Sequence, residues 1–436
     1  MLPRVRELHE RFPGILTVIG VHAGKFRAER ATPLIETARR RLGVEHPVVN
    51  DRRFRIWRAY GVTAWPTVAV VGPDGRLLGR IAGEFDVGAL AEEISGAADA
   101  YRADGLLRPG PEPFETVPSP AEEGALRFPS RALVSGGRLF VSDAGHRRVL
   151  EAEARRGPGR LAARVVRVWG DGRRGFADGA AGEARFAEPQ GLAATDGAVF
   201  VADRANHAIR RLDLASGEVR TVAGTGALAA GRLEEGDART PLRSPWGLLA
   251  EDGTLLCSMA GSHQLCRLRP HAGAWSLSVE AGTGAEDIRD GPARLAALAQ
   301  PTGLAAGTGG EVHVADCESS SVRALGGGGV RTLVGTGLFD FGDRDGPAGE
   351  ALLQHAEDVA FHRGAVVAAD TYNDKLKRID PASGETRSLP GEVAGGLSGP
   401  RGVASLGETL LVTDTDAHRL VEVAPDGSLA GVPIEL

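Results

Sequence analysis

Three histidines stand at matching places in this chain, and their side chains are of a type that binds metal ions. His207 and His418 each follow an aspartate by four residues, and His263 follows a methionine by four residues in the same pattern. Three imidazoles that meet at one point are a common ligand set for zinc. Each of these histidines belongs to a different repeat of the pattern, outside that repeat's innermost segment, so we do not expect them to meet. No metal and no other cofactor is predicted.

The three cysteines, Cys257, Cys266 and Cys317, are too few for a disulfide framework. Cys257 and Cys266 flank one predicted hairpin turn and could approach each other, but in a cytosolic protein we expect small core residues. The chain has no Ser-His-Asp ordering and no glycine-rich phosphate loop. The run Gly326–Gly329 lies between two predicted strands and is interpreted as a turn. No catalytic residue is therefore predicted.

Composition indicates an ordinary soluble protein and excludes several classes of ligand. Hydrophobic residues make up 42% of the chain and charged residues 25%, with a formal net charge of −6. Because no basic block is present, we do not expect nucleic-acid binding. The amino terminus lacks the apolar core of a secretory signal, and no segment approaches the ~18 apolar residues of a membrane span. We predict a cytoplasmic protein without membrane contact.

An internal repeat predicts the elements that position these residues. The pattern Pro-x-Gly-Leu-Ala precedes an apolar segment that ends in Ala-Asp, as in Pro189–Ala193 followed by Val199–Asp203. Each copy reads as four short strands separated by turn residues. A single four-stranded sheet cannot bury both faces, whereas six sheets packed radially can. We therefore predict an all-β, six-bladed β-propeller over residues 128–436. The aligned positions at the end of the second strand are Asp143, Asp203, Met259, Asp316, Asp370 and Asp414.

The repeated aspartates are interpreted as architecture, because carboxylates at turns commonly accept hydrogen bonds from local backbone amides. The chain also supplies a fourth strand for blade six at about 428–434, so the ring could close by packing alone. Alternatively, Phe114–Val117 could add to that blade as a clasp.

One face of the predicted propeller is the candidate partner surface. The turn between the second and third strands lies at the same end of a blade as the entry into its first strand, and loops on a rigid scaffold commonly carry function. We expect a protein partner of unknown identity there. The candidate residues are His146, Gln190, His207, Trp246, His263, Thr302, Glu357, Tyr372, Arg401 and His418.

The repeats resemble NHL repeats, whose hallmark is Asp, two residues, then Asn-His-(Arg or Ala)-Ile. This hallmark is clearest from Asp203 to Ile209. Blade three departs from it, because Met259 replaces the aspartate.

Residues 1–104 have a different pattern, in which helices and strands alternate as in an α/β domain whose helices cover a sheet. Residues 105–127 are interpreted as a linker. Strands are expected at Ile15–His22, Thr67–Val71 and Leu77–Ala82, and the amphipathic stretch Glu29–Leu42 predicts a helix. Further helices are expected at Leu2–Phe12, near Arg53–Tyr60 and at Asp86–Ala103, and a further strand at His46–Val49.

The stretch Val62–Val68, followed by Gly72-Pro73-Asp74-Gly75, resembles the thioredoxin-like fold. The resemblance implies that Pro66 is cis and that the loop Trp65, Pro66 and Thr67 is a site. That family's redox chemistry needs a Cys-x-x-Cys motif, and this chain has no cysteine before Cys257.

The central first strand of the thioredoxin-like fold is also missing from the sequence. Without it, Ile15–His22 and Thr67–Val71 would face each other across a gap. We expect that the natural protein begins some tens of residues upstream of Met1 and carries the missing cysteines there.

The order of the two parts resembles a family in which a thioredoxin-like domain precedes NHL repeats. The stretches that match include Ser244–Trp246, Met259–Gln264 and Ala315–Arg323. The family's further carboxy-terminal β domain does not follow. We therefore predict a protein-interaction propeller fused to a thioredoxin-like domain that has no redox cysteines in this chain. The alternatives are a shortened form of a thiol–disulfide oxidoreductase or a metal-dependent propeller hydrolase or lyase.

Overall fold

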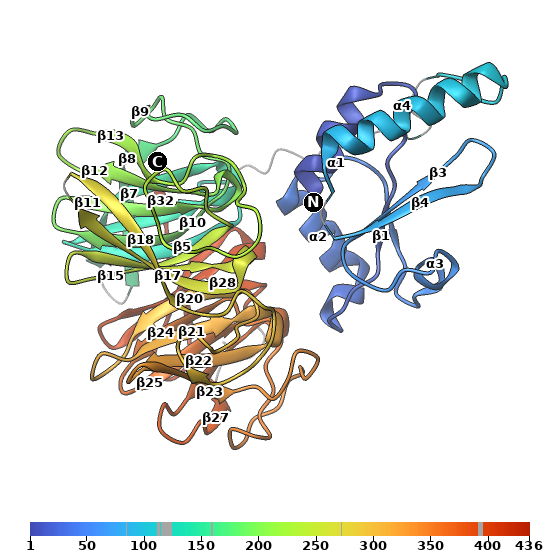
Figure 1. The fold of residues 1–436 in the computed structure, drawn as a ribbon. Coiled ribbons are helices and arrows are strands. Elements are labelled where there is room, and N and C mark those ends of the chain that lie inside the picture. The colour runs from blue at the N-terminus through green and yellow to red at the C-terminus, as the bar shows by residue number, and fades with distance from the viewer. Residues whose placement is uncertain (84, 111–113, 115–123, 158–159, 272, 391–395) are drawn as a thin grey trace. The chain divides into compact units, whose positions relative to one another are not determined.

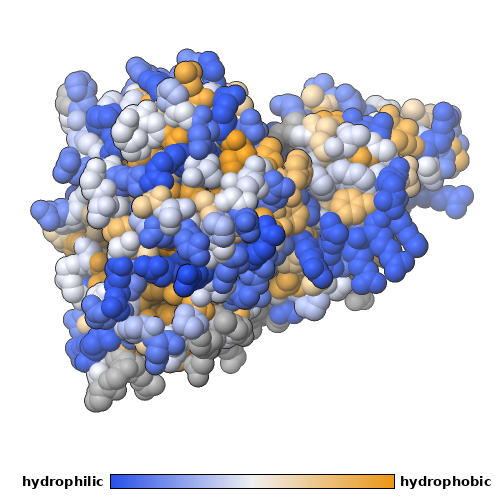
Figure 2. All heavy atoms as spheres, turned by 90° about the horizontal axis from the view of Figure 1, so that it is seen from below, coloured by the Kyte–Doolittle hydropathy of each residue, from blue (hydrophilic) through white to orange (hydrophobic). Residues whose placement is uncertain are grey.

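The computed structural model describes residues 1–436 except 84, 111–113, 115–123, 158–159, 272 and 391–395. The chain divides into two units, Met1–Ala121 and Glu122–Leu436 (Figure 1). Figure 2 shows charged and polar residues interspersed with apolar ones over the visible face of both units.

The amino-terminal unit consists of helices and two short sheets. Its elements are α1 (Leu2–Arg11), β1 (Gly20–His22), η1 (Ala28–Arg30), α2 (Thr32–Leu42), β2 (Val48–Asn50), α3 (Arg55–Ala59), β3 (Thr67–Val71), β4 (Leu77–Ala82) and α4 (Val87–Ala103). Strands β1 and β2 pair in parallel, and β3 and β4 pair antiparallel. Among the described residues no strand joins β1 to β3.

Two helices cover the β3–β4 hairpin. Leu8 of α1 and Leu90 and Ile94 of α4 form a buried cluster that packs against Val68 and Ile81. Helix α4 begins after Asp86, whose side chain accepts a hydrogen bond from the Ala89 N–H and so caps the helix. This cluster is the core of the unit.

Strands β3 and β4 have the predicted bounds, whereas β1 is shorter than predicted. The backbone N–H groups of Ile15 and Leu16 bond to the Phe12 carbonyl, so these two residues belong to the turn that ends α1. The predicted helix over 29–42 is also interrupted: η1 ends at Arg30, and α2 begins at Thr32 with Pro33 in its first turn.

The carboxy-terminal unit is a six-bladed β-propeller, as predicted. Four consecutive antiparallel strands form each blade, and the first strands contact one another in sequence around a closed ring. Blade one contains β5 (Pro129–Ser135), β6 (Arg138–Asp143), β7 (Arg148–Gly157) and β8 (Arg160–Trp169). Blade two contains β9 (Gly179–Ala180), β10 (Pro189–Thr195), β11 (Ala198–Asp203), β12 (Ala208–Asp213) and β13 (Glu218–Ala223).

The other four blades follow the same plan. Blade three contains β14 (Gly236–Asp237), β15 (Pro245–Glu251), β16 (Thr254–Met259), β17 (Gln264–His271) and β18 (Ala274–Ala281). Blade four contains β19 (Gly291–Pro292), β20 (Pro301–Ala306), β21 (Val312–Asp316), β22 (Ser321–Gly326) and β23 (Gly329–Val334). Blade five contains β24 (Asp358–His362), β25 (Ala365–Asp370), β26 (Lys375–Ile379) and β27 (Thr386–Ser388). Blade six contains β28 (Pro400–Leu406), β29 (Thr409–Asp414), β30 (Arg419–Val423) and β31 (Leu429–Gly431).

The ring closes by packing and by a clasp that the sequence did not predict. Strand β31 is the expected fourth strand of blade six, and the chain then crosses to blade one. There β32 (Ile434–Glu435) pairs in parallel with β8, and Ala163 donates a hydrogen bond to the Pro433 carbonyl at 2.9 Å. Of the alternative clasp at 114–117, residues 115–117 lie outside the described residues.

Candidate interaction face and channel

The repeated aspartates are architectural. In each of the five blades that has one, its Oδ1 accepts hydrogen bonds from backbone N–H groups just before that blade's first strand. For Asp203 these donors are Ala187 at 3.0 Å and Glu188 at 2.9 Å, while Oδ2 accepts from Asn206 at 2.6 Å. Burial raises the pKa of the Asp316 carboxyl to about 6 and that of Asp370 to about 7.

Blade three replaces this device with another. Met259 is buried, and Gln264 takes over the polar role: its side chain accepts from the Leu233 N–H at 2.7 Å and donates to the Leu233 carbonyl at 3.1 Å. Both backbone groups of the buried Leu233 are thereby satisfied without a carboxylate.

One end of the propeller, here called the turn face, carries the short 3-10 turns between second and third strands. They are η2 (Ala144–His146), η3 (Arg204–Asn206), η4 (Ala260–Ser262), η5 (Cys317–Ser319), η6 (Thr371–Asn373) and η8 (Thr415–Ala417). Each turn is followed by a non-glycine residue in the left-handed conformation, with φ between 48° and 58°. At three turns that residue is a candidate histidine.

These three histidines join neighbouring blades. His207 Nδ1 accepts a hydrogen bond from the Ser244 N–H at 3.2 Å, and His263 Nδ1 accepts from the Gln300 N–H at 3.1 Å. His418 Nδ1 accepts from the Phe128 N–H at 3.0 Å. In blades four and five the same contact is made by the side chains of Ser320 and Asp374. Burial, with Arg243 nearby, lowers the pKa of His263 to about 4, so the ring is neutral and keeps its acceptor.

The candidate histidines therefore do not converge on a metal site. Their Nδ1 atoms are used between blades, and His146 Nδ1 lies 2.8 Å from the Asp143 carboxylate of its own blade. Within the described residues, no group of three or more His, Cys, Asp or Glu side chains is arranged to hold a metal ion.

One position around the channel mouth on the turn face differs in every blade. It is the second residue of the first strand in five blades, and in blade five it is the residue just before β24. These residues are Ser130, Gln190, Trp246, Thr302, Glu357 and Arg401. Ser130, Gln190, Thr302, Glu357 and Arg401 are buried, whereas Trp246 is half-buried. The polar residues that recur in several blades serve the architecture. The ring position, which differs in all six blades, gives each blade its own chemistry.

Two groups of side chains extend from this ring. Arg204 of η3 lies over the Trp246 indole, with its guanidinium carbon 4.8 Å from the ring centroid, and is paired with Glu188 at 2.5 Å. On the other side of the mouth, His355 stacks on Tyr372 with the ring centroids 4.5 Å apart, and its Nδ1 lies 3.5 Å from Glu357.

The channel narrows to a waist where the residues that directly follow this ring position meet. Glycine occupies this place in four blades. A Cβ on Gly191 would lie 2.2 Å from the Trp246 carbonyl oxygen, and one on Gly247 would lie 2.1 Å from the Thr302 carbonyl oxygen, so neither would fit. In blades one and five the equivalent residues are Arg131 and Asp358, which pair across the waist at 3.2 Å.

This ion pair and the side chains of Arg204 and His355 are not among the residues predicted from the sequence. Alignment of the six repeats against one another would have indicated Arg131 and Asp358, because both stand where the pattern Pro-x-Gly requires glycine. Burial raises the pKa of Asp358 to about 6, even though the Arg131 charge opposes the shift.

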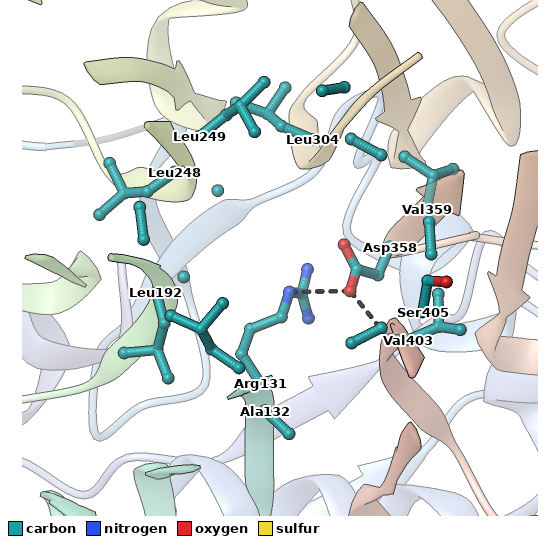
Figure 3. A pocket seen from close by; sticks show the side chains of 18 of the residues that line it. Arg131, Ala132, Leu192, Leu248, Leu249, Leu304, Asp358, Val359, Val403 and Ser405 are labelled. Atoms are coloured by element: carbon teal, nitrogen blue, oxygen red, sulfur yellow. Dashed lines mark hydrogen bonds and ion pairs between the residues drawn. The ribbon is translucent and has the colours of Figure 1, made fainter. Parts of the chain in front are cut away.

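A cavity of about 380 Å³ lies between the ion pair and the end of the channel opposite the turn face. Its walls come from the first strands of all six blades and include Leu192, Leu248, Leu304, Val359 and Val403 (Figure 3).

In the amino-terminal unit, the Trp65–Pro66 peptide bond is cis. Trp65 is 48% exposed, and its Nε1 donates to the Ala23 carbonyl at 2.7 Å. Its ring lies 4.5 Å from that of Trp57, and Thr67 Oγ1 donates to the Ala64 carbonyl at 2.7 Å. An aromatic surface thus surrounds the predicted loop.

The cysteines are buried and unpaired. Cys257 and Cys266 are direct cross-strand partners in β16 and β17, so they approach each other as the hairpin prediction allowed. Burial raises the pKa of Cys266 to about 12 and that of Cys257 well above its usual value.

Residues 186–212, which contain β10, β11 and most of β12, match the family model described as NHL repeat. The chain therefore contains an NHL repeat. Among the described residues of this chain, no helix is long and apolar enough to span a membrane.

The chain is similar to several curated proteins over most of its length. Protein SUPPRESSOR OF QUENCHING 1, chloroplastic, from Arabidopsis thaliana is 34% identical over 453 residues, which cover 98% of this chain and 42% of that protein. NHL repeat-containing protein 2 is 33% identical over 428 residues in Gallus gallus (90% of this chain, 58% of that protein) and 32% identical over 466 residues in Homo sapiens (93% and 61%). The chain thus spans roughly half the length of the curated relatives it matches.

Solved structures resemble the NHL propeller at low sequence identity. The nidogen/laminin complex aligns with a TM-score of 0.46 and 15% identity over 70% of this chain and 92% of that chain. The streptogramin B lyase structure aligns with a TM-score of 0.39 and 13% identity over 57% and 69%. These likenesses are too distant to bear on function.

Proposed function

We propose that the NHL propeller is a protein-interaction module that binds its partner on the turn face. The observation that carries the proposal is the ring at the channel mouth. The aspartates and histidines that recur from blade to blade make their hydrogen bonds inside the propeller, as do Ser130 and Thr302 of the ring. The ring residues nevertheless differ in every blade, and Trp246 is the one that is partly exposed. A surface that must recognise one partner needs such individual chemistry on a rigid frame.

Trp246 and Arg204 are the proposed centre of this surface. Tryptophan and arginine are over-represented among residues that dominate binding energy, because they combine a large apolar area with specific polar contacts. Trp246 is half-buried, so its ring is held in place while part of it stays open to solvent. Arg204 is fixed over it by the pair with Glu188, which lowers the entropic cost of binding.

For the amino-terminal unit we infer a thioredoxin-like domain whose exposed loop at the cis Pro66 is a binding surface. The cis Pro66 directly before β3, the β3–β4 hairpin and the following helix α4 support this assignment. All three cysteines lie in the propeller, so the exposed Trp65 beside Pro66 is the feature available for contact. The proposed setting is the cytoplasm, where buried unpaired cysteines stay reduced.

Affinity capture with the full chain tests the propeller proposal. The wild type, Trp246→Ala, Arg204→Ala and the control Arg363→Ala are compared on extracts of the source cells. Arg363 is an exposed arginine in the β24–β25 turn, at the opposite end of the strands. We expect a protein that the wild type and the control retain, and for which Trp246→Ala weakens binding at least about tenfold. Equal retention by all four chains would contradict the proposal.

A further inference from the structure

The channel cavity has features of a small-molecule site that are independent of the turn face. Its volume of about 380 Å³ is within the range of ligand pockets. It is closed at the waist by Arg131 and Asp358 and opens at the other end, where Ala306 and Ser405 are exposed. A ligand would therefore enter from the face opposite the proposed protein surface.

The waist presents both a donor and an acceptor. Arg131 has five N–H groups. Four of them are used by described residues: Nε pairs with Asp358, Nη1 donates to the Ser130 and Arg401 carbonyls, and Nη2 donates once to the Glu357 carbonyl at 2.7 Å. One N–H of Nη2 is left over. Because Arg131 itself lines the cavity, this donor is at its floor.

Asp358 supplies the acceptor. Its Oδ2 pairs with Arg131 Nε at 3.2 Å and accepts from the Val403 N–H at 2.9 Å. Its other carboxylate oxygen, Oδ1, lies beside Gly303, where an added Cβ would be 2.0 Å from it. Each charge of the pair is already balanced by the other, so an ionic ligand would meet a like charge in a poorly solvated place.

We propose that this cavity binds a small neutral molecule with an apolar body and a head group that both donates and accepts a hydrogen bond, such as a carboxamide or lactam. The body packs against Leu192, Leu248 and Leu304, which line the wall. The head group's N–H faces the Asp358 carboxylate, and its carbonyl faces the Arg131 guanidinium. The buried ion pair thus closes the channel at the waist and also recognises the head group of the ligand.

Three probes of nearly equal shape test the proposal: benzamide, benzoate and benzylamine. Binding to the full chain is followed by ligand-detected NMR titration. We expect saturable binding of benzamide, at least about tenfold tighter than that of benzoate or benzylamine. The absence of saturable benzamide binding would overturn the proposal. Binding of benzoate or benzylamine that is as tight as that of benzamide would also overturn it.

Substitutions in the channel locate the site. Leu304→Trp fills the cavity without touching the ion pair, and Leu304→Phe is a milder second variant in case the first does not fold. Either folded variant is expected to weaken benzamide binding at least about tenfold. Glu218→Gln, on the outer strand of blade two, is the control and keeps wild-type affinity. Unchanged binding in the Leu304 variants would place the probe elsewhere and refute the assignment.

Discussion

His418 Nδ1 accepts a hydrogen bond from the backbone N–H of Phe128, 3.0 Å away, and this contact joins the last blade of the propeller to the first. The Phe128 ring also packs edge-on against the imidazole, with the ring centroids 4.3 Å apart. The two residues are 290 positions apart in the chain, so the contact closes the ring.

Removal of this acceptor should weaken the closed ring. His418→Phe keeps an aromatic ring beside Phe128 but leaves its N–H without the acceptor. We expect the free energy of unfolding to fall by about 1 kcal/mol. Chemical denaturation measures the change, and His271→Ala, an exposed histidine of β17, is the control with little expected effect. Equal stability of His418→Phe and the wild type would show that the hydrogen bond does not contribute.

The contact of His263 with Gln300 should make stability depend on pH. The folded-state pKa of about 4 is below the ordinary value of 6.5, so the neutral ring is favoured by folding. Its contribution is fully present above pH 6.5 and declines as the pH falls toward 4. His263→Asn offers a non-titrating acceptor. Between pH 6.5 and pH 4 the free energy of unfolding should fall more in the wild type than in this variant. We expect the difference to reach up to about 3 kcal/mol. Parallel stability–pH curves for the two chains would contradict this account.

The carboxy-terminal clasp should stabilise blade one. Ile434 packs against the buried cluster that Leu161, Ala163 and Val432 help to form. Ile434→Asp places a charge beside this cluster and should lower the free energy of unfolding by roughly 1–3 kcal/mol. It should also speed hydrogen exchange of the Ala163 amide, which bonds to Pro433. Leu436→Asp is the matched control, because Leu436 is 71% exposed. Slow exchange at Ala163 in Ile434→Asp would argue against a clasp.

The buried cysteines should be unreactive in the folded chain. Burial raises the pKa of the Cys257 and Cys266 thiols, and the thiolate is the reactive form. Iodoacetamide at pH 8 should label neither residue in the native protein and both after denaturation, as read by mass spectrometry. Rapid labelling of native Cys257 or Cys266 would be inconsistent with their burial.

Much of the propeller could be predicted from sequence because each repeat is local. The aspartate, the turn after it and the first strand that it braces lie within about twenty residues. The residues that interact can therefore be recognised within a single copy of the repeat. For Asp203, the braced N–H of Ala187 is 16 positions away. The same locality allowed β3 and β4 to be predicted at their observed bounds.

Features that depend on the closed ring could not be predicted in this way. Arg131 and Asp358 are 227 positions apart and meet only because six first strands surround one channel. The pairing of β32 with β8 likewise needs the ring to close. The histidines illustrate the converse. Their place on the turn face was predicted, but the blade-to-blade hydrogen bond that occupies His207 involves Ser244, a residue of the next repeat.

Hydrogen exchange of the NHL propeller, alone and with its captured protein partner, tests the central claim most directly. The account predicts slower exchange on binding at the turn face, in η3 and η6 and at Trp246, with no change in the hairpin turn at 362–364 on the opposite face. Protection confined to that opposite face would contradict the assignment of the turn face as the protein-binding surface.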